Sequence, residues 1–122
     1  MIAELVLTAF ISLNPFNFTS EPYQAEELEP VGVYEITAYS YSEGYGENYE
    51  TATGEKPKPY RTVAVDPNVI PLGTELYIEG IGEVRAEDTG GAVKGNVIDL
   101  HIGYDDCNQF GRQKREVYII GE

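Results

Sequence analysis

The sequence has 122 residues, of which none is tryptophan, one is cysteine, one is histidine and only eight are lysine or arginine. A single cysteine excludes an internal disulfide and any metal site built from several thiolates. With one histidine besides, zinc would need an almost purely carboxylate site, which is unusual, so we expect no metal and no other cofactor. Against the eight basic residues stand 21 acidic ones, and the net charge of −13 argues against a nucleic-acid partner.

Long hydrophobic segments are also lacking. The apolar run at residues 5–13 (LVLTAFISL) is too short to span a membrane, which takes about 20 residues. Its length suits the apolar part of an export signal, but Glu4 stands where such a signal carries positive charge. Residues 1–30 also hold three prolines and five acids, with no basic residue. We therefore expect a leader and acidic linker, with a weak signal or anchor as the alternative to a loosely docked leader.

The remainder, residues 31–122, has the composition and length of one β domain. Short segments rich in β-branched and aromatic residues alternate with glycine- and proline-rich turns, which is typical of strands in a small barrel. One short helix is indicated at about residues 105–111. We expect an all-β fold, a six-stranded barrel with at most that one helix. The expected strands lie at residues 33–41, 61–65, 74–79, 83–87, 96–102 and 116–120.

Three aspartates are candidates for chemistry: Asp66 in AVDP, Asp88 in AEDTGG and Asp99 in NVIDLHI. An aspartate before proline commonly begins a turn, and Asp-Thr-Gly-Gly suits a side-chain-bonded turn, so the first two have simple structural explanations. Asp99 is harder to explain, because aspartate is depleted in strands. It would share a strand face with His101, opposite an apolar face, and a merely solvated face is the structural alternative.

A carboxyl group on a strand beside a glycine-rich loop suits a sugar site. Gly90, Gly91 and Gly95 precede Asp99, and glycines allow positive φ or a close approach of the backbone to a ligand. Glycosidic cleavage requires a carboxylic acid that protonates the leaving oxygen, and partial burial keeps such a group protonated. The pattern therefore favours glycan chemistry at Asp99.

The segment at residues 59–103 resembles the three-aspartate (3D) domain family of bacterial cell-wall proteins, and the resemblance extends over residues 34–120. It rests on the spacing of Asp66, Asp88 and Asp99, on the turn VDPNVIPLGT and on the run DTGGAVKGNVID. The family includes stationary-phase survival and germination-type proteins and is similar to the catalytic barrel of membrane-bound lytic transglycosylase A. The resemblance implies a double-psi β-barrel. It also implies cleavage, without water, of the bond between N-acetylmuramic acid and N-acetylglucosamine in peptidoglycan.

The same resemblance assigns roles to residues. Asp99 is the implied general acid/base, Asp88 orients or tunes it, and Asp66 braces the groove. The implied partner is a peptidoglycan glycan strand, met by a monomer outside the cell or in its wall, with no stable membrane span. The substrate-binding positions that it carries over are Tyr39, Thr53, Gly54, Thr89, Gly90, Gly91 and Lys94.

In the implied reaction, protonated Asp99 donates to the glycosidic oxygen. The resulting carboxylate then takes the proton of the C6 hydroxyl of the same sugar, and that hydroxyl closes a 1,6-anhydro ring. One carboxyl group performs both transfers, unlike the two carboxyl groups of ordinary glycosidases. Like-charge repulsion from Asp88 is expected to raise the pKa of Asp99.

Two other functions remain open. The motif DTG at residues 88–90 is the signature of retroviral-type aspartic proteases, but Glu87 precedes it where that class has an apolar strand end. A noncatalytic, expansin-like barrel that binds wall glycan is the alternative outside enzymology. Cys107 is expected to be an inert or partly exposed thiol. His101 is expected to be an exposed strand residue, and contact with the groove on the face that it shares with Asp99 is the alternative.

Overall fold

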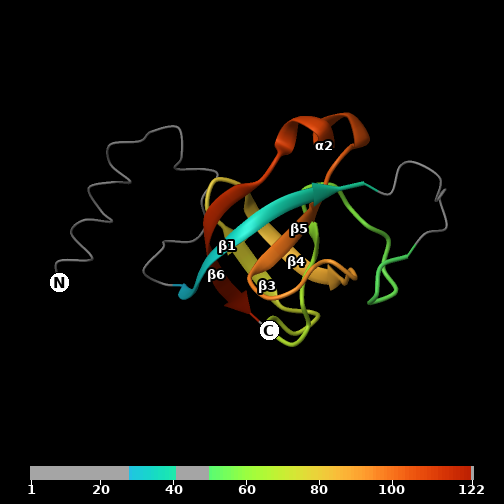
Figure 1. Ribbon diagram of the computed structural model, residues 1–122. Helices are drawn as coiled ribbons and strands as arrows, with labels where there is room; N and C mark the ends of the chain where they lie inside the picture. Colours follow the sequence, from blue (N-terminus) through green and yellow to red (C-terminus); the bar gives the residue numbers. More distant parts are fainter. Residues whose placement is uncertain (1–27, 41–49, 122) are drawn as a thin grey trace, which may run out of the picture.

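The computed structural model describes residues 28–40 and 50–121 (Figure 1). Residues 1–27 of the expected leader and linker, and residues 41–49, lie outside the described residues. Within the described part the chain forms six strands and one helix. These are β1 (Glu29–Tyr39), β2 (Thr62–Ala64), β3 (Glu75–Ile78), β4 (Gly82–Asp88), β5 (Val97–His101), α2 (Tyr104–Phe110) and β6 (Gln113–Gly121).

The strands close into a barrel in the order β1-β5-β2-β4-β3-β6, and β6 pairs with β1. Two neighbouring pairs, β1 with β5 and β2 with β4, are parallel, and the other pairs are antiparallel. Figure 1 shows β1 running across the front of the barrel, with α2 above it. The expectation of a six-stranded barrel with one short helix is confirmed for the described residues, and the strand order is consistent with a double-psi barrel.

The strands differ from the expected ones mainly near the ends of the barrel segment. β1 already begins at Glu29, and Glu29 and Pro30 pair with Ile119 and Tyr118 of β6. β6 likewise begins early, at Gln113. Glutamate and proline are disfavoured in strands, so the local pattern indicated a linker. The long antiparallel ladder between the two strands overrides that local preference.

The core consists of side chains on the inner faces of the strands. Ile36 of β1, Val63 of β2, Leu76 of β3, Leu100 of β5 and Val117 of β6 have no exposed surface. Alternate residues of a strand point to opposite faces, so the residues next to these in sequence lie on the outer wall of the barrel. The part of that wall formed by β1, β5, β2 and β4 carries the candidate site.

α2 covers one end of the barrel, and Cys107 and Phe110 of this helix pack against the core. Burial raises the pKa of the Cys107 thiol, which favours its protonated form and fits the expected inert thiol. No helix formed by residues 28–40 and 50–121 has the length and apolarity needed to cross a membrane.

We expect Leu76→Ala to lower the free energy of unfolding by about 2–5 kcal/mol, because it leaves a cavity in a fully buried site. Urea unfolding would measure the loss. Val69→Ala removes methyl groups from a side chain that is 41% exposed and serves as the control, with an expected change within about 0.5 kcal/mol. Equal losses in the two variants would contradict the core assignment.

Candidate functional site

Asp88 and Asp99 lie on either side of β2 on the outer wall. Ala64 of β2 pairs with Asp99 of β5 on one side and with Asp88 of β4 on the other. Directly paired residues point to the same face of a sheet, and two strand spacings separate the aspartate backbones by roughly 10 Å. The side chain between them is a single methyl group. A larger residue at Ala64 would therefore fill the space between the two carboxyl groups.

A β-bulge in β4 determines which acid occupies the position beside Ala64. The register pairs Val63 with Ala86 and then Ala64 with Asp88, so Glu87 is the extra residue. Bulges are frequent next to active sites, where they turn a side chain to a new direction. Here the bulge brings Asp88, and not Glu87, level with Asp99.

The carboxyl group of Asp99 is half-buried and hydrogen-bonded. Thr37, its partner in the parallel β1–β5 ladder, donates from Oγ1 to Asp99 Oδ1 at 2.8 Å. The pKa of Asp99 is raised, chiefly by burial and to a smaller degree by the charge of Asp88, while the Thr37 hydrogen bond works in the opposite direction. Both partial burial and repulsion by Asp88 were expected from the sequence to keep this group protonated. The larger cause is desolvation, which sequence spacing cannot measure.

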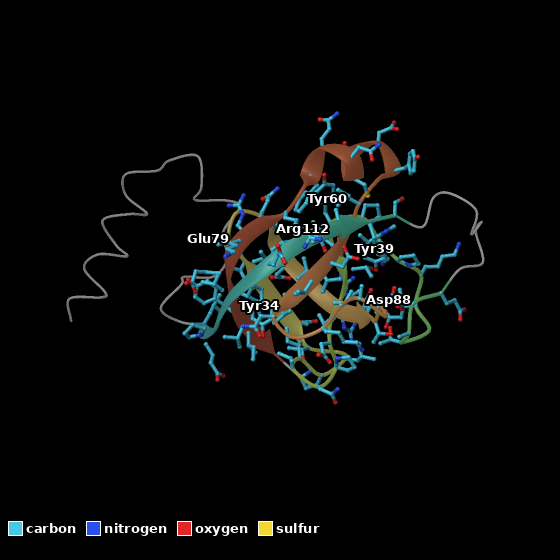
Figure 2. The ribbon with its side chains drawn as sticks, in the orientation of Figure 1. Tyr34, Tyr39, Tyr60, Glu79, Asp88 and Arg112 are labelled. Carbon is cyan, nitrogen blue, oxygen red and sulfur yellow. The ribbon has the colours of Figure 1, made fainter. Side chains whose placement is uncertain are left out.

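Asp88 is held by two donors from different parts of the chain. The Tyr39 hydroxyl donates to Asp88 Oδ2 at 3.2 Å, and the backbone N–H of Ala52 donates to Oδ1 at 3.0 Å. Figure 2 shows Tyr39 and Asp88 close together at one side of the barrel. Asp88 is only 5% exposed, so these contacts fix its orientation. They also bring the end of β1 and the segment at residues 50–61 to the site.

Residues 51–54 (TATG) form a turn that lies against the end of β4. The backbone N–H of Thr53 donates to the carbonyl of Glu87 at 3.1 Å, and its hydroxyl lies 3.0 Å from that of Thr51. Gly54 closes the turn by donating to the Thr51 carbonyl at 2.9 Å. Thr53 and Gly54 therefore lie beside the Asp88 end of the wall.

Asp66 ties two connections together at a different place. It accepts hydrogen bonds from the backbone N–H of Gly95 at 2.9 Å and from that of Asn68 at 3.0 Å. These two bonds, the Gly95 bond first, hold the pKa of Asp66 below its ordinary value, and the Lys94 charge assists. This geometry suits the bracing role expected for Asp66.

The three glycines of the connection between β4 and β5 differ in their backbone conformation and in the space around them. Gly90 and Gly91 do not adopt positive φ, and the left-handed residue is Gly95, with φ of 68°. Gly90 is instead limited by packing, since a Cβ there would lie 3.0 Å from Val93 Cγ2, whereas Gly91 has open space. The expected groove residues Thr89, Gly91 and Lys94 are exposed in this connection.

Two aromatic residues at the end of β5 have positions that the sequence did not reveal. His101 is only 6% exposed, and its ring lies 5.4 Å from that of Tyr39, so the expectation of an exposed residue is wrong. Burial is the main reason that the pKa of His101 is lowered. Tyr60, which donates its backbone N–H to the His101 carbonyl at 2.8 Å, has a left-handed φ of 62° although it is not glycine. Residues with such strained backbone conformations cluster at functional sites, and no local sequence pattern predicts the conformation of Tyr60.

Glu87 is a third residue whose placement the sequence did not reveal. It is 2% exposed and accepts a hydrogen bond from Thr62 Oγ1 at 2.7 Å. Its pKa is raised, first by burial and then by the neighbouring Glu55. Glu87 therefore helps to hold the segment at residues 51–62 against β4.

The site combines two carboxyl groups in different environments. Asp99 can hold a proton because burial raises its pKa, and Asp88 is fixed by donors on the far side of Ala64. Paired carboxyl groups of this kind carry out general acid/base chemistry. Among residues 28–40 and 50–121, no group of three or more histidine, cysteine, aspartate or glutamate side chains is placed to hold a metal ion.

Comparison with known sequences identifies a matching protein family and a similar protein from Bacillus subtilis. Residues 61–121 match the family described as the 3D domain. The cell wall-binding protein YocH of Bacillus subtilis (strain 168) is 44% identical over 88 residues, which cover 69% of this chain and 30% of YocH.

Comparison with solved structures gives the same barrel. A crystal structure of MltA from Escherichia coli, described as a lytic transglycosylase fold, matches with a TM-score of 0.51 and 25% identity over 58% of this chain and 27% of MltA. MltA with bound chitohexaose matches with a TM-score of 0.52 and 23% identity over 61% of this chain and 28% of MltA. The chain thus spans less than a third of the length of YocH or MltA.

We expect Asp66→Asn to lower the melting temperature near neutral pH and to have a shrinking effect as the pH falls. A lowered pKa in the folded state means that ionised Asp66 stabilises the fold above its unfolded pKa. That contribution is lost as the pH falls through the folded pKa. Thermal melts at several pH values would measure it, with Glu83→Gln, at an exposed position, as the control. A deficit that does not change with pH would contradict this account.

Proposed function

The chain belongs to the 3D domain family, and we propose that it is a peptidoglycan lytic transglycosylase in which Asp99 is the general acid/base. The observation that carries the proposal is the half-buried carboxyl group of Asp99, with its raised pKa, facing the same side as Asp88 across Ala64. The fold shared with MltA, which binds chitohexaose in one crystal structure, supports a glycan substrate. We further propose that the protein acts as a monomer on the cell wall, outside the cell.

The proposed reaction uses one carboxyl group twice, first as an acid and then as a base. Protonated Asp99 gives its proton to the glycosidic oxygen while the bond from that oxygen to the muramic anomeric carbon breaks. The C6 oxygen of the same sugar bonds to the anomeric carbon, and its proton passes to the Asp99 carboxylate. The product is a 1,6-anhydro ring, no water is consumed and the acid is restored. Attack within one sugar also profits from the high effective concentration of a tethered nucleophile.

Thr37 and Asp88 have opposing effects on this acid. The Thr37 hydroxyl stabilises the ionised form of Asp99 and so favours proton release. Asp88 disfavours the ionised form by repulsion and so favours proton uptake. An acid/base that must both give and regain a proton works best with a pKa near the working pH. Burial and Asp88 raise the pKa of Asp99 in that direction, and Thr37 limits the rise.

A second candidate function is glycan binding without cleavage, of the expansin type. The observation that favours it is the similarity to YocH, which is named a cell wall-binding protein. Binding alone has no need of a carboxyl group with a raised pKa, which is why we rank it second. The aspartic-protease hypothesis gains no support from a barrel in which Asp88 is held by Tyr39 and Ala52 of its own chain.

We expect Asp99→Asn to reduce turnover of purified peptidoglycan by on the order of 10²–10⁴-fold, the usual contribution of a positioned general acid/base. The variant should melt at least as high as the wild type, because it removes a carboxyl group that is costly to ionise where it is buried. Mass spectrometry of wild-type digests should show 1,6-anhydro products, lighter by one water than hydrolysis products. Wild-type protein that binds peptidoglycan and releases no fragment would favour the binding function.

We expect Thr37→Val and Asp88→Asn to move the alkaline limb of the pH–rate profile in opposite directions. Thr37→Val removes a donor to the carboxylate, so the pKa of Asp99 rises and the limb moves to higher pH. Asp88→Asn removes a repelling charge, so the pKa falls and the limb moves to lower pH. Profiles of kcat/KM against pH would measure both, and shifts of the same sign would remove Asp99 from the acid role.

A further inference from the structure

A pocket of about 460 Å³ opens on the barrel away from Asp88. It is lined by Val33, Tyr34, Glu35, Asn96 and Lys114. Figure 2 shows Tyr34 nearer the start of β1 and away from Tyr39 and Asp88, which lie near the end of that strand. None of these five residues belongs to the site described above.

The strand register makes this pocket continuous with the wall that carries Asp99. In the parallel β1–β5 ladder Glu35 pairs with Val97, two residues before the pair of Thr37 with Asp99. Residues two apart on a strand share a face and lie about 7 Å from each other. Glu35 also pairs with Lys114 of β6, so Lys114 belongs to the same face. A ligand held at Asp99 would thus need to extend only about 7 Å along the strands to reach the pocket.

Positive charge gathers at the pocket in a chain that has little of it. Arg112 and Lys114 are two of only eight basic residues, and Lys114 lines the pocket. Arg112 Nη1 lies 3.2 Å from Glu35 Oε1 and neutralises that carboxylate. No carboxylate of the described residues lies within ion-pair distance of Lys114. The pocket therefore presents a cation toward a ligand, although the protein as a whole is strongly acidic.

The remaining lining adds apolar and amide groups. Val33 is 49% exposed, so its methyl groups are available to a small apolar side chain. Asn96 is exposed beside it and carries both a donor and an acceptor suited to a peptide unit. A cation, a small apolar surface and an amide together match a short anionic peptide better than an uncharged sugar.

We propose that this pocket binds the stem peptide of peptidoglycan, an alanine-containing peptide with free carboxylates that is attached to the muramic acid unit held at Asp99. Lys114 pairs with a peptide carboxylate, and Val33 contacts an alanine methyl group. The inference rests on the proposed function, because it takes the muramic acid at Asp99 as the anchor. It adds to that function a preference for glycan that still carries its peptides.

Binding measurements in the Asp99→Asn background test the proposal without consuming the ligand. The two ligands are soluble peptidoglycan oligosaccharides with stem peptides and the same oligosaccharides after removal of the peptides by an amidase. We expect tighter calorimetric binding of the peptide-bearing form. Lys114→Glu should weaken that binding by on the order of tenfold, the effect of losing one good charge contact. It should affect the stripped form much less. Lys56→Glu, the same change at an exposed lysine that does not line the pocket, is the control.

The outcomes separate this inference from the proposed cleavage. Equal affinity for the two ligands, no binding of either, or equal losses in the Lys114→Glu and Lys56→Glu variants would overturn the pocket assignment. Release of anhydro products by protein with intact Asp99 is scored independently. If the Lys114 effect appears and no anhydro product forms, the cleavage proposal fails and the peptide pocket stands. If product forms and the Lys114 effect is absent, the pocket assignment fails and the cleavage proposal stands.

Discussion

The inward packing of Ile98 and Leu100 is the interaction on which the candidate site depends. Both side chains are fully buried, and they fix the pleat of β5 so that Asp99 between them must face the outer wall. Ile36 imposes the same constraint on its neighbour Thr37 in β1. A slip of one residue in either strand would turn the carboxyl or hydroxyl group into the core and the apolar side chains out to the wall. The register that builds the core is therefore the register that assembles the site, and neither can change alone.

The aspartates of this protein are held in contrasting environments. Asp66 receives two backbone N–H groups, which favour its ionised form, so it adds to stability at neutral pH. Asp99 is partly desolvated, which disfavours its ionised form and carries a cost in stability at the same pH. Sites that need a reactive group commonly accept such a cost, and the surrounding fold offsets it. The hydrogen bond from Thr37 to Asp99 offsets part of this cost.

The arrangement suits a polymer that lies along the barrel. The groups of interest follow one another across β6, β1, β5, β2 and β4, from Lys114 through Thr37 and Asp99 to Asp88. At the Asp88 end, the segment at residues 51–62 is fastened to β4 by hydrogen bonds to Asp88 and Glu87. A row of functional groups on an outer wall makes successive contacts with a long chain, whereas small ligands are usually enclosed in a cavity.

Local pattern was sufficient for much of this protein and insufficient for the geometry of its site. The sequence by itself determined the six strands, the short helix, the alternation that places Asp99 opposite an apolar face, and the three aspartates as candidates. These features depend on neighbouring residues, and their period can be seen in the chain. Only the tertiary structure decided that Ala64 pairs with both aspartates, that a bulge sets Glu87 aside in favour of Asp88, and that His101 is buried against Tyr39. The physical reason is that pairing between strands far apart in sequence, and the desolvation that follows from it, are set by how the closed barrel packs and have no signature in any single segment.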